Sequence, residues 1–513
     1  MFPRTDFLKN NTLLNYMPIK TMVFPFVAHA LLYFFPKNNN YVLCLKAVVA
    51  GRITSVTGYH KATKKSLAMI TNCTSSSTSN TSRFVGAGLI AGLSSLLFPI
   101  IAFAQESSIY VQCKPTTPLH PLAGGTSDDG SSIKCDHLVA GDGMVTMADD
   151  NKKLQYVFGF ERVALPGEYD PAAEETAPTV ESGDYPGWVM DRGLLAATMP
   201  APTISIDEDD ELFLSLTNVG MAMRPDLFDP HTIHWHGFPQ ASAIFDGVPD
   251  ASVSINMGST LTYYYLAKDA GTYMYHCHVE AAEHMQMGMW GSLFVRPRQN
   301  RCSDIDDASI PGGSCPSGHA DGHTYAYNDG DGSTRYDVDF PIQIGSFDPD
   351  FHDASFNVQP LPFADMRDRY YLLNGRGYPD TTDPEVLTTV DPLGKEQKSQ
   401  PVTSLITAKK GQRILLRISN LSVTSFYTIG VNGLPMEVVG LDARLLRDDD
   451  NNNMYYKTNS LTLGGGQSAD VIIDTTELPA DSTYFFYTKN LDKLANDAEN
   501  FGGMMTEIRI TGA

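Results

Sequence analysis

Six histidines and one cysteine are concentrated in a short stretch of this chain, with the spacing of metal ligands. The chain has 13 histidines in 513 residues, and six of them lie between residues 231 and 284. They form two groups, His231-Thr-Ile-His234-Trp-His236 and His276-Cys277-His278 followed by His284. A lone histidine is usually a core or surface residue, but a cluster this dense is typical of a metal site.

Strand geometry divides these side chains between two faces. Residues two apart on a β-strand point the same way, so His234 and His236 should project from one face. His276 and His278 should form a second pair on a neighbouring strand, with Cys277 directed to the opposite side. The sequence therefore predicts a nest of four imidazoles, which suits copper, zinc or iron.

The cysteine is expected to bind a further metal ion on the other face. Cys277 would meet His231 and His284 there, and two histidines, one thiolate and a weak axial methionine form a blue-copper site. Met289, which follows a turn after His284, is the preferred axial ligand. Two other methionines compete for that role, Met285 and Met287. The backbone would then join this copper to ligands of the other metal site by a few bonds, a path suited to electron transfer.

The elements that must position these residues are predicted to be β-strands in two copies of one sandwich. Apolar residues alternate along most of the chain after residue 105, as in half-buried strands. Residues 202–218 indicate a strand, an acidic turn and a strand, and residues 404–420 repeat that layout. Three further pairs of segments match in the same order: 255–265 with 463–473, 271–275 with 482–486, and 288–295 with 503–510. We therefore expect an all-β chain with the metal ligands in the first copy.

The N-terminal region differs from the rest of the chain and is predicted to be an export signal. Residues 84–104 carry no charge and end in Ala-Phe-Ala, which is the pattern of a cleaved signal peptide, although a membrane anchor is the alternative. About 80 residues precede this segment, so Met69 is a candidate start. We expect a secreted or periplasmic protein that keeps no stable membrane span after cleavage.

Four regions are expected on this basis. They are an extension with its signal peptide (1–104, the signal about 80–104), a metal-binding domain (105–300), a linker (301–335) and a second domain without ligands (336–513). The net charge of -22 argues against a nucleic-acid partner. Two local disulfides, Cys113–Cys135 and Cys302–Cys315, fit an oxidising compartment and leave Cys277 unpaired.

These motifs together resemble those of the multicopper oxidase family, which includes laccases and copper nitrite reductases. The segment His234-Trp-His-Gly-Phe238 resembles the first copper motif of laccases, and His276-Cys-His278 resembles their last. The resemblance implies two Greek-key, cupredoxin-like (plastocyanin-like) sandwiches. It also implies a type 1 copper at His231, Cys277, His284 and Met289, and type 2/type 3 copper at His234, His236, His276 and His278.

An acidic residue follows the first motif. Phe245-Asp246-Gly247 is similar to the Asp-Gly of the family, where the Asp assists proton delivery to the copper centre that reduces oxygen. The resemblance therefore implies a catalytic role for Asp246 as a general acid. The alternative for Asp246 is a turn residue before glycine.

The chain also departs from the family pattern. A laccase cluster takes eight histidines from two domains, whereas this chain offers four, and its second copy has Phe426–Gly433 and Tyr487-Thr-Lys489 where ligands would fall. The spacing from Cys277 to His284 is closer to that of nitrite reductases, which lack the second histidine after the cysteine. The sequence is intermediate between the two groups.

The leading hypothesis is a copper-dependent oxidase that takes electrons from a small-molecule or metal-ion reductant and reduces dioxygen to water. The alternatives are an enzyme like copper nitrite reductase, and a non-catalytic blue-copper electron-transfer or copper-binding protein. Four histidines fall short of a trinuclear site, so we expect a homo-oligomer, with a trimer favoured by the two-domain relatives. His352, in the second domain, is a candidate ligand donated across the interface.

Overall fold

The computed structural model describes residues 33–37, 40–44, 109–304 and 322–512. By internal contacts the chain divides into two units, Met1–Glu106 and Ser107–Ala513. In the first unit the described residues form one antiparallel hairpin, β1 (Tyr33–Lys37) with β2 (Asn40–Cys44). The predicted signal peptide lies outside the described residues. None of the helices in the described part of the chain is long and apolar enough to cross a membrane.

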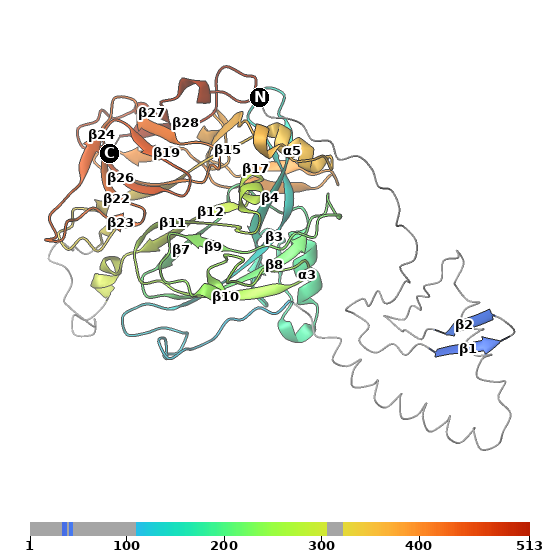
Figure 1. Ribbon diagram of the computed structural model, residues 1–513. Coiled ribbons are helices and arrows are strands. Elements are labelled where there is room, and N and C mark those ends of the chain that lie inside the picture. Colours follow the sequence, from blue (N-terminus) through green and yellow to red (C-terminus); the bar gives the residue numbers. More distant parts are fainter. Residues whose placement is uncertain (1–32, 38–39, 45–108, 305–321, 513) are drawn as a thin grey trace, which may run out of the picture. The chain divides into compact units, whose positions relative to one another are not determined.

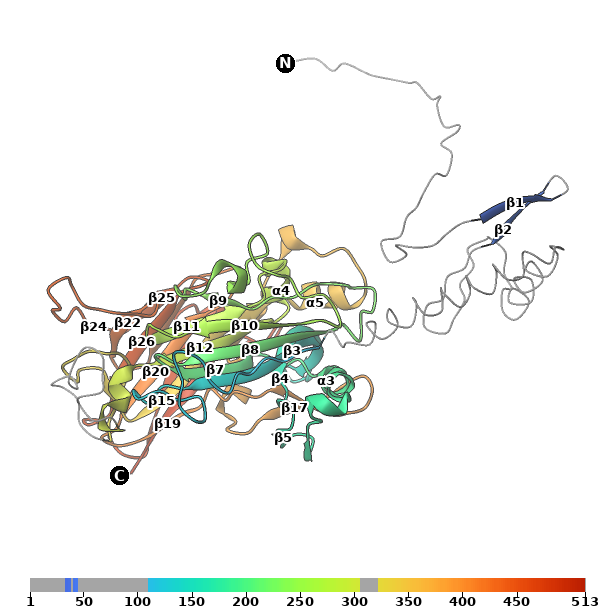
Figure 2. The same ribbon diagram turned by 90° about the horizontal axis from the view of Figure 1, so that it is seen from below.

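The second unit begins with a β-sandwich of two four-stranded sheets (Figures 1 and 2). In spatial order, one sheet contains β10 (Thr260–Leu266), β8 (Glu211–Gly220), β3 (Ile133–Thr146) and β4 (Leu154–Arg162). The other contains β7 (Ala201–Asp207), β12 (Trp290–Arg296), β11 (Gly271–His276) and β9 (His234–His236). One core joins the two sheets, with Leu138 and Phe158 from the first packed together with Ile204 and Leu293 from the second.

A second sandwich follows in the chain. In spatial order, its larger sheet contains β16 (Tyr370–Leu373), β15 (Val338–Phe347), β20 (Arg413–Asn420), β26 (Ser468–Asp474), β22 (Met436–Leu441) and β23 (Arg444–Leu445), and β24 (Tyr456–Thr458) also pairs with β22. The smaller contains β19 (Ile406–Lys409), β28 (Met505–Thr511), β27 (Ser482–Thr488), β21 (Tyr427–Val431) and β25 (Leu461–Leu463). Ile344 and Leu416 from the larger sheet pack with Phe486 and Ile508 from the smaller.

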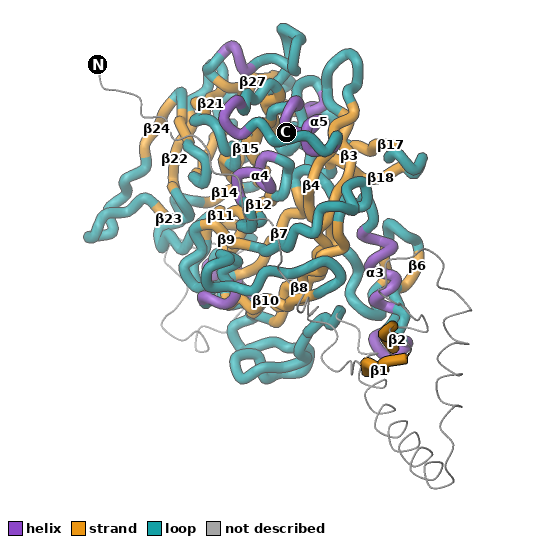
Figure 3. Tube along the Cα trace, turned by 45° about the vertical axis from the view of Figure 1, so that its right-hand side comes forward, coloured by secondary structure: helices purple, strands orange, loops and turns teal. Residues whose placement is uncertain are grey.

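The two sandwiches share one strand plan. β3 runs parallel to β8 in the first, as β15 runs parallel to β20 in the second. β7 runs parallel to β12, as β19 runs parallel to β28. β7 and β8 carry the first repeated segment read from the sequence, as β19 and β20 carry its second copy, and β12 and β28 carry the last repeated pair. Figure 3 shows strands throughout this unit and few helices, so the all-β prediction is confirmed. The domain bounds at residues 300 and 336 stay a prediction.

Helices and small hairpins cover the outside of the sandwiches. α3 (Tyr185–Gly193) packs on β3 and β8, and α5 (Pro349–Phe356) packs on β4. α4 (Ala281–Gln286) lies between β11 and β12 in the chain. The small hairpins are β5 (Tyr169–Asp170) with β6 (Glu175–Thr176), β13 (Thr324–Tyr325) with β14 (Arg335–Tyr336), and β17 (Leu387–Val390) with β18 (Glu396–Gln400). Short 3-10 helices span Val180–Ser182, Ala243–Phe245, Arg298–Asp304, Phe363–Asp365, Asp380–Thr382 and Leu491–Lys493.

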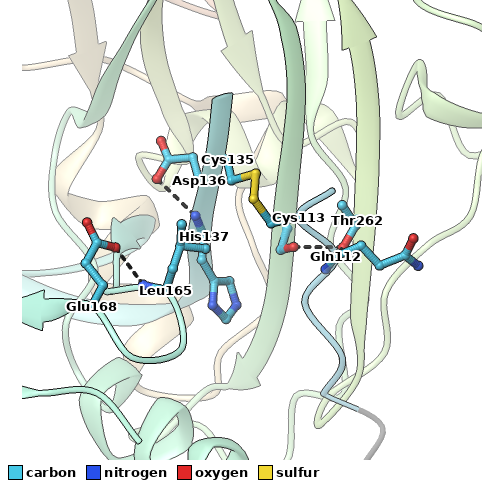
Figure 4. The surroundings of a disulfide bond; sticks show 9 residues. Gln112, Cys113, Cys135, Asp136, His137, Leu165, Glu168 and Thr262 are labelled. Atoms are coloured by element: carbon cyan, nitrogen blue, oxygen red, sulfur yellow. Dashed lines mark hydrogen bonds between the residues drawn. A yellow bond between two sulfur atoms is a disulfide. The ribbon is translucent and has the colours of Figure 1, made fainter. Parts of the chain in front are cut away.

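One disulfide fastens the beginning of the second unit to the first sandwich (Figure 4). Cys113 bonds to Cys135 on β3, and the adjacent Gln112 N–H donates to Thr262 Oγ1 on β10 at 3.2 Å. The predicted Cys113–Cys135 bridge is therefore confirmed. Its predicted counterpart, Cys302–Cys315, involves a residue outside the described part of the chain and stays a prediction.

A buried polar contact joins the two sandwiches. Arg417 on β20 lies over the Phe294 ring of β12, with its guanidinium carbon 5.0 Å from the ring centroid, and Nη1 is 3.8 Å from Asp470 Oδ1. The same carboxylate oxygen accepts from Thr272 Oγ1 on β11 at 2.6 Å. Leaving either buried charge alone would be costly, so this contact holds the second sandwich against the strand that ends at His276.

Candidate metal centres

His231, Cys277 and His284 converge in a pocket that solvent does not reach. The Nδ1 atom of His284 lies 3.2 Å from Cys277 Sγ, and Nδ1 of His231 lies 3.8 Å from the same sulfur. The three potential ligand atoms all lie within 4.8 Å of one another, and all three residues are 0 % exposed. The structure therefore brings together the three residues that the sequence assigned to one face.

Each of these three side chains is positioned by a separate element. His231 and Ile255 exchange two backbone hydrogen bonds, of 3.0 and 2.9 Å. Cys277 directly follows β11, and its N–H donates to Met289 O at 3.1 Å. His284 lies on α4, in the segment that returns the chain to β12. The pocket is thus closed by residues that only the folded sandwich brings together.

The chemistry of this donor set fits copper. Burial lowers the pKa of His284 to about 4 and that of His231 well below its ordinary value, so both rings are neutral near pH 7. The Nδ1 atoms of both rings face the sulfur, and their Nε2 atoms are buried without a hydrogen-bond partner. In the tautomer that carries its proton on Nε2, each ring offers its Nδ1 lone pair to a metal ion beside the sulfur. Two neutral imidazoles and a cysteine sulfur are the equatorial ligands of a blue-copper site.

Burial also sets the state of the thiol in the metal-free pocket. It raises the pKa of Cys277 to about 12, so the sulfur carries its proton near pH 7. A metal ion binds the thiolate, so copper has to displace this proton on loading. Cys277 is free and buried, in agreement with the unpaired thiol expected from the sequence.

The three candidate axial methionines lie in different surroundings. Met287 and Met289 are fully buried in the core cluster that contains Cys277. Met285 packs instead against the cluster that contains Trp290, and its carbonyl oxygen accepts from the indole N–H of Trp290 at 3.1 Å. The backbone bond from Cys277 to Met289 favours Met289, and its choice over Met287 stays a prediction.

Four imidazoles form the second cluster, at the edge of the sheet where β9 pairs with β11. His276 is directly opposite His234 in the register of these strands. The ring centroid of His234 lies 5.7 Å from that of His236, 5.2 Å from that of His276 and 5.0 Å from that of His278. His276 is buried, and the other three are half-buried. The predicted nest of four imidazoles is therefore present.

Backbone carbonyls fix the orientation of two of these rings. Nδ1 of His234 lies 2.6 Å from Asp246 O, and Nδ1 of His276 lies 2.8 Å from Cys277 O. Because a carbonyl oxygen only accepts, both Nδ1 atoms carry the proton and both Nε2 atoms are free as ligands. His276 Nε2 lies 3.3 Å from His236 Nδ1, inside a group of ligand atoms within 4.8 Å of one another that His234 completes. Burial lowers the pKa of all three rings, which keeps them neutral.

Asp246 lies beside this cluster, where the resemblance to the family places it. Its Oδ1 atom is 3.6 Å from His234 Nδ1, and its side chain is 31 % exposed. Gly247 makes this approach possible, because it has φ of +78° and an added Cβ would lie 2.2 Å from Ile233 O. The Asp-Gly pair therefore brings both a carbonyl and a carboxylate to His234.

One residue next to this cluster comes from the second sandwich and was missed in the sequence. Gly466, with φ of +85°, lies against the His236 ring so closely that an added Cβ would be 2.7 Å from Nε2. Together with Gly464 and Gly465 it forms a run of three glycines, which predicts a turn. Such a run does not indicate that one of its members contacts a histidine ring. The second sandwich thus covers one side of the four imidazoles.

The expectation that His352 is a ligand donated across an interface is wrong. Its side chain is 0 % exposed, with Nδ1 2.5 Å from Tyr156 O and Nε2 2.9 Å from Gln286 O. Both ring nitrogens face backbone carbonyls of the same chain, so the ring cannot reach a partner.

Comparison with known protein families agrees with this geometry. Residues 192–300 and residues 356–505 each match a family model described as multicopper oxidase, and together the two matches span half of the chain. The chain belongs to the multicopper oxidase family. The first match contains all eight predicted copper ligands, and copper is accordingly the cofactor of this family member.

Individual multicopper oxidases are similar over parts of their length. The multicopper oxidase MCE of Talaromyces pinophilus is 32% identical over 124 residues, which is 24% of this chain and 19% of the relative. Copper resistance protein A of Escherichia coli is 24% identical over 328 residues, 64% of this chain and 48% of the relative. The blue copper oxidase structure from Nitrosomonas europaea has 21% sequence identity and a TM-score of 0.49, and the match covers 74% of this chain and 86% of that one. The chain thus spans half or less of the curated relatives' length.

Proposed function

We propose that this chain is an oxidase that takes single electrons from a small-molecule or metal-ion reductant and reduces dioxygen to water. The observation that carries the proposal is the adjacency of two ligand clusters on opposite sides of His276-Cys277-His278. One site can accept electrons and the other can hold the oxygen-reducing centre, with only backbone between them. A zinc store or a structural site has no need of this connection.

The roles of the residues follow from their positions. His231, Cys277 and His284 would hold a type 1 copper, with Met289 as its axial ligand. The four imidazoles of His234, His236, His276 and His278 would hold type 2/type 3 copper. When bound, copper supplies one-electron redox chemistry at both sites. The protein supplies neutral rings with oriented nitrogens and a pocket that keeps water away from the sulfur.

Proton supply is the second requirement of the proposed reaction. Dioxygen takes up four electrons and four protons to give two molecules of water, so a proton donor must stand beside the oxygen-reducing centre. The carboxylate of Asp246 is next to His234 and partly exposed, so it can take protons from solvent and pass them inward. We propose Asp246 as this general acid.

We further propose that another copy of the chain completes the second site, with a trimer as the favoured assembly. His234, His236 and His278 are half-buried, and the chain's own second sandwich covers only the His236 side through Gly466. Exposed apolar side chains flank the cluster: Ile244, next to the Asp246 segment, is 51 % exposed, and Phe426, which packs on Gly464, is 71 % exposed. Association would cover these side chains and add ligands. We propose a secreted or periplasmic location, on the basis of the predicted signal peptide.

The oxidase proposal is tested by incubating the copper-loaded protein with an organic or ferrous reductant in an oxygen electrode, with and without nitrite. Oxygen uptake at one molecule for each four electrons is expected, and nitrite should leave it unchanged. Consumption of nitrite without oxygen uptake would favour an enzyme like copper nitrite reductase. A blue protein that is reduced but consumes neither acceptor would be an electron-transfer protein, and the oxidase proposal would fail.

Association is tested by dilution. Turnover and the type 1 absorption band are followed together while the protein is diluted through its dissociation range, with mass measured by light scattering. We expect turnover to fall while the band persists, because only the second site needs a partner. A fully active monomer would contradict the shared site.

A further inference from the structure

The backbone carbonyls of the segment from His284 to Met289 accept hydrogen bonds that hold this loop in place. His284 O accepts from Met289 N, and Met287 O accepts from Phe158 N on β4, both at 2.9 Å. Gln286 O instead lies 2.9 Å from a ring nitrogen of the second sandwich, His352 Nε2, which donates to it in the tautomer that carries the proton there. The side-chain amide of Gln286 also donates to a residue of that sandwich, Asp368, at 3.3 Å.

His352 itself is fixed from several directions. It lies on α5, whose start is capped by Asp348 through a bond from Asp350 N. Its ring packs against Phe347, with centroids 4.3 Å apart, and its Nδ1 atom lies 2.5 Å from Tyr156 O on β4. The imidazole thus stands between β4 and the ligand loop, in a site without solvent.

The loop that contacts His352 carries two of the four predicted type 1 ligands, His284 and Met289. His284 precedes Gln286 by two residues, and Met289 follows it by three, so a shift of the Gln286 peptide moves the supports of both side chains. His231 is paired to Ile255 of the first sandwich and does not depend on this loop for its backbone bonds, whereas the N–H of Cys277 donates to the carbonyl of Met289 at the end of the loop. Groups that orient metal ligands without touching the metal are known to change affinity strongly.

We propose that His352 is a positioning residue of the type 1 site: the second sandwich, which has no copper ligands of its own, holds the His284–Met289 loop in its binding geometry through the His352 imidazole. This rests on the type 1 assignment proposed above. It gives the second sandwich a part in the metal chemistry of the first.

Two substitutions separate the contacts of this imidazole. In His352→Gln the side-chain amide nitrogen replaces Nε2 and can still donate to Gln286 O. In His352→Asn it replaces Nδ1 and can reach only Tyr156 O. Both variants lose the ring packing on Phe347 to a similar degree, so they form a matched pair. Asp353→Asn serves as a control on α5, because Asp353 contacts Lys153 and Gln155 of the first sandwich and not the loop.

The readouts are copper affinity at the type 1 site, the visible and spin-resonance spectra, the reduction potential and the melting temperature of the copper-free chain. We expect His352→Asn to lose roughly tenfold in affinity, as for other groups that orient ligands, and to shift both spectrum and potential. His352→Gln should recover the wild-type spectrum and potential, and Asp353→Asn should leave them unchanged. The melting temperatures of the Gln and Asn variants should fall alike.

Equal spectra and potentials in wild type, Gln and Asn variants would overturn the proposal, and so would a failure of both variants to fold, which would assign His352 to domain packing alone. A wild-type chain that binds copper at this pocket without a blue or green band would instead contradict the type 1 assignment.

Discussion

The two ligand clusters lie on either side of one short segment, yet they differ in how the fold supports them. The His231–Cys277–His284 pocket is 0 % exposed, and one chain provides all three of its ligands. The four-imidazole cluster has one buried and three half-buried rings, and part of its support is a glycine from the second sandwich. The first site is therefore a pocket closed to solvent, whereas the second is partly open to solvent.

This difference indicates which steps each site can carry out alone. A closed pocket preserves its geometry between oxidation states and needs no access for a substrate, because electrons can enter through the protein. In the proposed oxidase, the site that reduces dioxygen must admit oxygen and protons, and the half-open face next to Asp246 would provide that access. The substitutions below are ordered from the largest expected effect to the smallest, and each tests one of the two sites.

The first prediction removes the sulfur ligand. Cys277→Ser should abolish the intense visible band and reduce turnover to background, because the thiolate is the source of both the colour and the entry path for electrons. Copper bound at the four imidazoles should remain, and its spin-resonance signal serves as the internal control. An unchanged visible spectrum would contradict the type 1 assignment.

The same thiol should be unreactive in the folded, copper-free chain. Burial raises the pKa of Cys277 to about 12, and the thiolate is the reactive form, so an alkylating reagent near neutral pH should label it only after unfolding. Fast labelling of the native protein would show that the pocket opens.

The second prediction disrupts copper binding at the four-imidazole cluster and leaves the His231–Cys277–His284 pocket intact. Gly466→Ala places a methyl group against His236 Nε2 at a left-handed backbone position, so copper at the second site and turnover should both fall sharply. The backbone strain alone costs about 1–2 kcal/mol. Gly411→Ala is the matched control, since its φ is +92° and its Cβ would meet nothing within 4 Å. Loss of the type 1 band in Gly466→Ala would show that the sites are not separable.

The third prediction separates the role of the backbone carbonyl of Asp246 from the role of its side-chain carboxylate. Asp246→Asn keeps the backbone carbonyl that orients His234 and removes the proton-donating carboxylate, so turnover should fall about 10²-fold with both copper sites intact. Steady-state oxygen uptake and metal analysis check this. Asp250→Asn, an exposed acid on the same loop, should have no effect. Equal activities of the two variants would assign Asp246 to the turn alone.

The fourth prediction concerns the reduction potential of the type 1 site. Met289→Leu conserves volume, so it should fold, keep its colour and raise the reduction potential, because loss of a weak axial donor favours the cuprous state. Turnover should change only a few-fold. A potentiometric titration of Met289→Leu beside Met287→Leu identifies the axial residue: if only Met287→Leu shifts the potential, Met289 is the wrong choice.

Much of the site could be predicted because it depends on local geometry. The alternation of a β-strand places His234 and His236 on one face whatever else the fold does, and it directs Cys277 away from the flanking histidines. The repeated strand pairs were also visible, because alternation survives wherever one face of a strand is buried. Alternation does not reveal β3, which contains Gly141 and Gly143 packed close to neighbouring backbone, together with a buried Asp142.

The contributions of Gly466 and His352 could not be predicted for a different physical reason. Each acts through the packing of the second sandwich on the first, at a sequence separation of more than 60 residues from its partner. Glycine beside glycine suggests a turn, and the sequence around His352 contains no pattern that points to the His284–Met289 loop. Only the docking of the two sandwiches gives these residues a place beside the ligands.

The hydrogen bond from His276 Nδ1 to Cys277 O makes the two histidines beside the cysteine inequivalent in their connection to it. His276 is joined to Cys277 both by a peptide bond and by this 2.8 Å contact between its ring and the cysteine's carbonyl, which bypasses several bonds of the backbone. The backbone N–H of His278 donates instead to Thr232 Oγ1 at 3.1 Å. In the proposed oxidase, electrons that leave the sulfur would have two parallel routes to His276 and one to His278, so a metal ion bound by His276 should be better coupled to the type 1 copper than one bound by His278.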